Sequence, residues 1–164
     1  LWLAIQTQQL FSEIKKVIII GIVWALGAAF YFYMPLASMT NLARVLHHIG
    51  GLMNPEEDVL VLYLTSHGSE KHRLSVVNWP LRLDEIDPAA LKRMLEESGI
   101  KWRVIAISAC YAGGFIGPLK DEMTLIMTAA DAQKQSFGCG TQSDFTYFGK
   151  AVFDEELRRT HSFT

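Results

Sequence analysis

Residues 59–68 read VLVLYLTSHG, an almost uninterrupted apolar run that ends in a serine, a histidine and a glycine. The same design returns at residues 104–114, VIAISACYAGG, where an apolar run leads into Cys110 and then into paired glycines. Short apolar runs that are bounded by turn residues are typical of strands buried on both faces of a parallel sheet. The two stretches therefore predict two such strands, at 59–65 and 103–109, each followed closely by a chemically reactive side chain.

A helix is predicted between these two strands. Asp87 is a good N-cap, Pro88 suits the first turn, and Gly99 marks the end of the apolar periodicity. Strand, helix and strand in this order form a right-handed crossover, so the two strands should be parallel. The carboxyl ends of parallel strands lie at one edge of the sheet, which is where open α/β sheets place their sites. We therefore expect His67 and Cys110 to lie at the same edge.

The remainder of the chain from residue 38 also reads as α/β. A helix is predicted at residues 42–49, before Gly50 and Gly51, a further strand at 124–130, and a last amphipathic helix at about 145–158. With 164 residues, the chain is long enough for one domain with one sizeable core. The sequence thus predicts a single α/β domain over residues 38–164.

Residues 1–37 have a different composition. Residues 17–37 carry no charge, and at about 1.5 Å per residue a helix of this length would cross the hydrocarbon core of a bilayer. Lys15 and Lys16 flank one end, and aromatic residues gather toward the other. We predict a single membrane helix at 17–37, with the domain that follows on the outer side. A buried hydrophobic hairpin or a signal-like segment is the alternative interpretation.

Cys110 and His67 have the chemistry of a nucleophile and its base. The thiolate is the attacking form of cysteine, and an imidazole can take the thiol proton and later return it to a leaving amine. A glycine after the histidine lets a substrate approach the backbone, and its N–H could face a developing oxyanion. Taken singly, a cysteine at a strand end is more often core filler, and a His-Gly pair is more often a turn. Their joint placement favours catalysis.

The chain from about residue 35 to 157 resembles the legumain-type (asparaginyl endopeptidase) cysteine peptidases, particularly their bacterial members. The resemblance rests on four stretches, which are SHGS at 66–69, SACYAGGF at 108–115, TAAD at 128–131 with SFGC at 136–139, and TYFG at 146–149. It implies a caspase-like fold, a three-layer α/β sandwich around a mainly parallel sheet. It also implies Cys110 as nucleophile, His67 as general base and acid, a thioester acyl-enzyme, and the N–H groups of Gly68 and Cys110 as the oxyanion hole.

The chain departs from the family pattern at two pocket positions. Legumains place a glutamate two residues before the nucleophile and an aspartate after the Tyr-x-Gly of the last helix, where this chain has Ser108 and Lys150. Ser136 and Asp144 are the other predicted pocket residues. We expect weak preference for asparagine and better tolerance of acidic or small polar residues before the scissile bond. A second interpretation is that Lys150 points to solvent and takes no part in substrate recognition.

The family's domain normally opens with a strand and a helix that carry an asparagine, and residues 1–34 contain no asparagine. Either the apolar stretch replaces that unit, or the domain is incomplete at its N-terminus. The second possibility gives the main alternative function, an inactive membrane-attached remnant or binding module of the same fold. A third is a small-molecule-binding α/β domain, which would require His67 and Cys110 to be far apart.

Composition and spacing predict no other ligand class. A formal net charge of −2 and the lack of a basic stripe argue against nucleic acid as a partner. His67 and His72 have no third ligand at the spacing of a metal site, and no cofactor is predicted. Lys71, His72 and Arg73 are interpreted as a solvated charged turn. The predicted partners are a peptide or protein substrate and, through residues 17–37, a membrane. The predicted location is the bacterial inner membrane with a periplasmic catalytic domain.

Overall fold

The computed structural model describes residues 17–23, 39–77, 84–137 and 146–159, the first of these ranges by its backbone alone. Its elements, in chain order, are β1 (Val17–Val23), α1 (Met39–Gly50), β2 (Val59–Thr65), α2 (Pro88–Glu97), β3 (Trp102–Ser108), the 3-10 turn η1 (Ala112–Phe115), α3 (Ile116–Leu119), β4 (Thr124–Thr128), α4 (Tyr147–Gly149), the π-helical η2 (Lys150–Glu156) and α5 (Leu157–Arg159).

The strands form one parallel sheet in the order β1-β2-β3-β4. The last residues of the two central strands, Thr65 and Ser108, are register partners, so β2 and β3 end side by side. The predicted parallel pairing of these strands is confirmed. The segments that follow them, which carry His67 and Cys110, therefore leave the sheet at the same edge.

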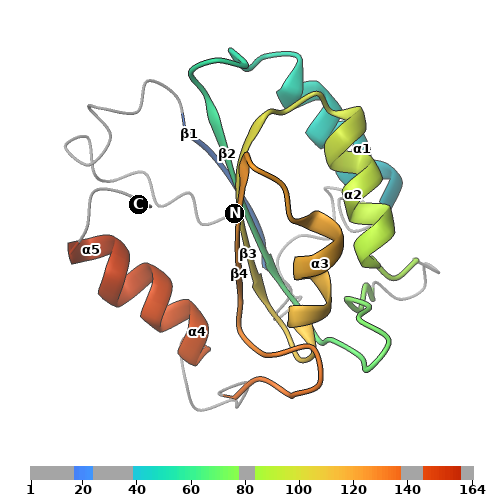
Figure 1. Cartoon of the computed structure of the whole chain (residues 1–164), viewed down its shortest axis with the longest axis vertical. Helices are drawn as coiled ribbons and strands as arrows, with labels where there is room; N and C mark the ends of the chain where they lie inside the picture. The colour runs from blue at the N-terminus through green and yellow to red at the C-terminus, as the bar shows by residue number, and fades with distance from the viewer. Residues whose placement is uncertain (1–16, 24–38, 78–83, 138–145, 160–164) are drawn as a thin grey trace.

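Helices cover both faces of the sheet (Figure 1). On one face lie α1, α2 and α3, and on the other lies the helical segment from α4 to α5. On the first face, alternate residues of the central strands join the helices in a core cluster whose fully buried side chains include Leu42, Leu46, Leu60, Leu62, Leu91, Leu95, Ile105, Ile107 and Phe115. On the second face, the Tyr63 ring meets the Phe153 ring edge to face, with 4.8 Å between centroids. The sheet is thus the middle layer of three.

The ends of the helices follow from particular side chains. Asp87 caps α2 by accepting a hydrogen bond from the Ala90 N–H at 2.8 Å, and Gly99 follows the helix with a φ of 70°. Thr146 caps the last helical segment in the same way, by accepting from the Gly149 N–H at 3.0 Å. For these two helical segments the predicted boundaries are confirmed to within two residues because these local signals decide them, whereas α1 begins three residues before its predicted start at residue 42.

The N-terminal prediction is wrong where the structure tests it. Val17–Val23 were predicted as the first part of a membrane helix, but they form β1, which pairs with β2 along its length. The rest of that predicted helix, residues 24–37, lies outside the described residues. None of the helices in the described ranges is long and apolar enough to span a membrane. The predicted inner-membrane location has no test here and stays a prediction.

Candidate active site

The loop that carries His67 lies directly against the backbone of Cys110. The Ser66 N–H donates to the Ser108 carbonyl at 3.2 Å, which extends the pairing of β2 and β3 past their last residues. One residue beyond His67, a Cβ on Gly68 would lie only 1.9 Å from the carbonyl oxygen of Cys110 and 3.2 Å from its nitrogen. The structure therefore brings His67, Gly68 and Cys110 together at one edge of the sheet.

The His67 loop folds back on itself as a short hairpin. The Ser75 N–H donates to the His67 carbonyl at 2.9 Å, and the Ser66 hydroxyl donates to the Ser75 carbonyl at 2.6 Å. An antiparallel bridge joins Gly68 to Leu74, which is itself bridged to Ile86. The backbone on both sides of His67 is thus hydrogen-bonded, while its side chain is exposed. An exposed imidazole on a fixed backbone is accessible to a substrate at the sheet edge.

A third loop, which follows β4, holds the sulfur of Cys110. The Ser136 N–H donates to Sγ at 3.3 Å, and the Ser136 hydroxyl lies 3.6 Å from the same sulfur. The Tyr111 N–H donates to the Lys134 carbonyl at 2.8 Å, which ties the same two segments together by their backbones. The Cys110 side chain is only half-buried. Donors at the sulfur stabilise negative charge there, so Ser136 is suited to support a thiolate.

Two backbone N–H groups lie at this edge, one on each loop. Within the described residues, the N–H groups of Gly68 and Cys110 donate no hydrogen bond, although their backbones pack against each other. An N–H pair of this kind is the usual means of binding an oxyanion in acyl transfer. Both were predicted for this role.

Ser108 lies beneath the edge, on the face covered by the last helix. It is 4 % exposed, and its hydroxyl lies 3.1 Å from the Thr146 hydroxyl, the residue that caps that helix. The predicted pocket position is therefore linked to the start of the segment that carries Lys150. Lys150 itself is exposed, with its amino group 3.9 Å from the Glu155 carboxylate. Asp144 lies outside the described residues, and the pocket roles of all three stay predictions.

His72 is the residue of this region that the sequence interpretation missed. It was assigned to a solvated turn, but its side chain is half-buried and its Nδ1 lies 3.1 Å from the Tyr111 carbonyl oxygen. Three atoms of its ring lie within 2.5 Å of the place that a Cβ on Gly114 would occupy. No local pattern marks this contact, because it depends on two loops that only the sheet brings together.

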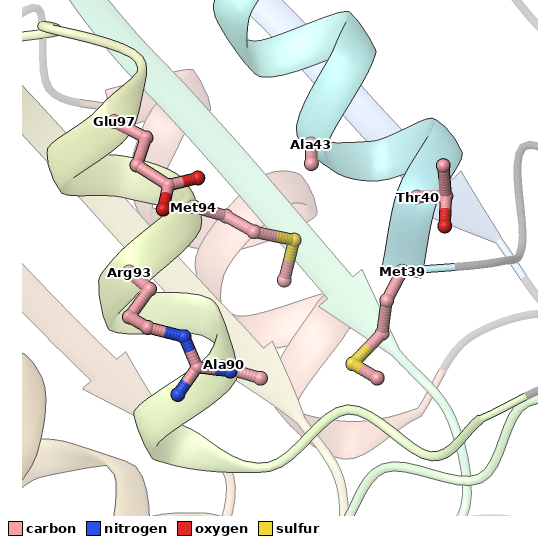
Figure 2. Close-up of a pocket in the computed structure, with 7 residues that line it drawn as sticks. All are labelled: Met39, Thr40, Ala43, Ala90, Arg93, Met94 and Glu97. Carbon is pink, nitrogen blue, oxygen red and sulfur yellow. The ribbon is translucent and has the colours of Figure 1, made fainter.

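A shallow groove lies between α1 and α2 (Figure 2). It has a volume of about 210 Å³ and is lined by Met39, Thr40, Ala43, Ala90, Arg93, Met94 and Glu97. The Met39 and Met94 side chains extend into the space between the two helices. None of its lining residues is a predicted site residue, and it contains no nucleophile with a base beside it.

In the described part of the chain, no group of three His, Cys, Asp or Glu side chains could hold a metal ion. Whether the protein uses a metal or a cofactor is not tested by this observation. The chemistry at the sheet edge is that of a thiol, an imidazole and two backbone donors.

The model of the peptidase C13 family matches residues 39–164, which is most of the chain. The chain belongs to the peptidase C13 family. This is the legumain family, so the resemblance that was based on the sequence motifs is confirmed. Peptidase C13 membership and the mixed α/β architecture are consistent with the predicted caspase-like fold, and they indicate a cysteine peptidase that acts on peptides or proteins. Comparison with curated proteins gives no match.

Proposed function

We propose that this peptidase C13 protein is a cysteine endopeptidase that uses Cys110 as nucleophile and His67 as general base and acid. The observation that carries the proposal is the contact between the Gly68 backbone and the Cys110 backbone where β2 and β3 end. It holds the residue after His67 against the backbone of the nucleophile, which supports a shared substrate position for the imidazole and the thiol. The Ser136 N–H, which donates to the sulfur, supports the same assignment.

The reaction follows from these positions. His67 takes the thiol proton, and the thiolate of Cys110 attacks the scissile carbonyl carbon, so that a C–S bond forms and the π electron pair moves to oxygen. The N–H groups of Gly68 and Cys110 bind that oxyanion. The C–N bond then breaks, and His67 returns its proton to the leaving amine, which leaves a thioester. Water attacks the thioester with His67 as base, and the C–S bond breaks to release the acid and restore the thiolate.

The pocket that binds the side chain of the residue before the scissile bond is expected to differ from the pocket of asparagine-specific relatives. Ser108 and Lys150 replace two acidic residues of the family pattern, so an amide substrate side chain loses acceptors for its N–H₂ group. The hydrogen bond between the buried Ser108 side chain and the Thr146 hydroxyl supports a pocket floor made of hydroxyl groups rather than a carboxylate. We propose weak preference for asparagine, with better tolerance of acidic or small polar residues.

The test is covalent labelling and hydrolysis. A peptide with a thiol-reactive electrophile should label the wild type and not Cys110→Ala, and a peptide substrate library should be cleaved by the wild type alone. His67→Ala should lower kcat by about 10²–10⁴-fold, as expected for the loss of general acid–base catalysis. The matched control is His48→Ala, because His48 is exposed on α1, away from the sheet edge.

Unchanged labelling in Cys110→Ala would overturn the assignment of the nucleophile. Folded wild-type protein that neither reacts nor cleaves would favour the alternative, an inactive binding module of the same fold. The motivation for that alternative was a missing N-terminal strand and helix. The presence of β1 beside β2 and of α1 after it weakens that motivation.

A further inference from the structure

His72 and Tyr111 share a backbone conformation that is rare for residues other than glycine. Their φ angles are 56° and 57°, and among the described residues no other non-glycine residue has a positive φ. Left-handed backbone costs free energy in such residues, and it persists where the surrounding contacts hold it. These two strained residues contact each other, since Nδ1 of His72 lies 3.1 Å from the Tyr111 carbonyl oxygen.

The direction of this hydrogen bond is fixed by its acceptor. A carbonyl oxygen only accepts, so Nδ1 of His72 carries the proton and donates. Nδ1 donates in the neutral ring of this tautomer and in the charged ring alike. The Tyr111 carbonyl also accepts from the Gly114 N–H at 3.2 Å. His72 therefore stabilises the turn that immediately follows the nucleophile.

The ring of His72 also sets the distance between the two loops. A Cβ on Gly114 would lie 2.1 Å from Cγ and 2.3 Å from Nδ1 of His72, so the ring occupies the place of a side chain there. The turn that carries His72 closes on Ser69, because the His72 N–H donates to the Ser69 carbonyl at 2.8 Å. Ser69 follows Gly68, whose backbone is packed against Cys110. The loops of His67 and Cys110 are thus in contact at Gly68 and again at His72.

We propose that His72 is a positioning residue, which donates to the Tyr111 carbonyl and so holds the Cys110 thiol and N–H in register with His67 and Gly68. This inference rests on the proposed function, because it concerns the same nucleophile. His72 acts through Tyr111 and exchanges no proton with the substrate. Its loss therefore lowers the rate of the chemical step and leaves substrate binding unchanged.

The test compares His72→Asn with His72→Asp in the full chain. The two side chains have the same shape and both tolerate a positive φ, but only asparagine can donate in place of Nδ1. His72→Asn should retain most of kcat, with a pH profile of the same form as that of the wild type. His72→Asp should lower kcat about tenfold, which corresponds to the loss of one hydrogen bond, with KM unchanged.

Two further variants separate the hydrogen bond from charge and from folding. Lys71→Gln changes the net charge of this turn by one negative unit, as His72→Asp does, because it removes one positive charge from an exposed residue. Lys71→Gln should leave kcat unchanged. His72→Gly has neither charge nor donor and adopts positive φ freely, so it should lose kcat as His72→Asp does. Thermal unfolding of each variant shows whether it is folded at the assay temperature.

Equal kcat in the Asn and Asp variants, or loss of the acidic limb of the pH profile in His72→Asn, would overturn the positioning role. The second result would make His72 itself the acid–base group. If the wild type does not cleave peptides, the proposed function fails separately, and the rate at which iodoacetamide alkylates Cys110 becomes the readout. That rate should then differ between His72→Asp and His72→Asn, and equal rates would contradict the proposal.

Discussion

Gly68 decides how closely the histidine loop can approach the nucleophile. A Cβ at this position would lie 1.9 Å from the Cys110 carbonyl oxygen and 2.9 Å from its carbonyl carbon. Both atoms belong to the backbone at the end of a central strand, so they cannot turn aside as a flexible side chain would. Any larger residue must push the two loops apart. The need for glycine here is steric, and it is located at the proposed oxyanion hole.

We therefore expect Gly68→Ala to lower kcat/KM by about 10²-fold, the cost that a displacement of about 1 Å can have in an active site. The control is Gly117→Ala in α3, where an added Cβ meets no atom within 4 Å. Hydrolysis of a peptide substrate and the thermal unfolding midpoint should be measured for both. Similar activity in the two variants would show that the close approach of Gly68 to Cys110 has no catalytic importance.

At the scale of elements, the sequence predicted best where one local signal was sufficient. The strand predicted at 59–65 has the same bounds as β2, and the strand predicted at 103–109 lies one residue beyond β3. Both were recognisable because a buried parallel strand is apolar on both faces. The cap of α2 followed from Asp87 alone. The contact of His72 with Tyr111 could not be predicted, because it joins residues that are 39 positions apart.

The loop between α3 and β4 is joined to the start of β3 by a charge pair. The Arg103 guanidinium donates to the Asp121 carboxylate at 2.6 Å, and the Met123 N–H donates to it at 2.8 Å. Partial burial by itself would raise the pKa of Asp121, but the nearby Thr124 side chain, the Met123 N–H and the charges of Arg103 and Lys92 together lower it below its usual value. The folded state therefore favours the ionised carboxylate.

The lowered pKa of Asp121 predicts a pH-dependent contribution to stability. The contribution should be complete above about pH 4, which is the pKa of an aspartate in the unfolded chain. It should disappear as the pH falls through the lower pKa of the folded state. The carboxylate is 43 % exposed, so solvent screening limits the effect to about 1 kcal/mol at most. In urea unfolding at pH 6, the free energy of unfolding of Asp121→Asn should be lower than that of the wild type. Below the folded pKa of Asp121 the two proteins should have the same free energy of unfolding.

Glu122→Gln is the control for this variant, since it removes a neighbouring exposed carboxylate. Its free energy of unfolding should stay close to that of the wild type at both pH values. A stability difference between Asp121→Asn and the wild type that persists unchanged at low pH would contradict an electrostatic origin.

At the scale of the whole molecule, the sequence misled at the N-terminus for a physical reason. A run of 21 uncharged residues satisfies the length of a membrane helix, and an apolar run shows no periodicity that separates a helix from a buried strand. Val17–Val23 are rich in β-branched residues, which favour strands, and this was the available signal. In the structure they extend the sheet beside β2, so the central position of β2 in the molecule depends on them.

Proline substitutions at Ile19 and Ile20 distinguish the strand from a helix. Ile19 pairs with Val61 and Ile20 with Leu62, and in a parallel strand only alternate residues direct their N–H toward the partner. One proline should therefore remove a hydrogen bond to β2 and lower the free energy of unfolding by about 1 kcal/mol or more. The other should cost much less, because the outer edge of a terminal strand tolerates proline.

In a helix that begins at residue 17, as predicted, both positions would lie in the first turn, where the N–H groups have no intrahelical partner and proline is tolerated, so both prolines should cost little. The measurement is the urea midpoint followed by tryptophan fluorescence, for both variants and the wild type. Unequal shifts are the result expected of β1, since adjacent strand residues face opposite ways. Equal shifts, whether small or large, would contradict the pairing of β1 with β2. With β1 absent from the sheet, β2 would become an edge strand, and the loop that carries His67 would begin from a less constrained strand.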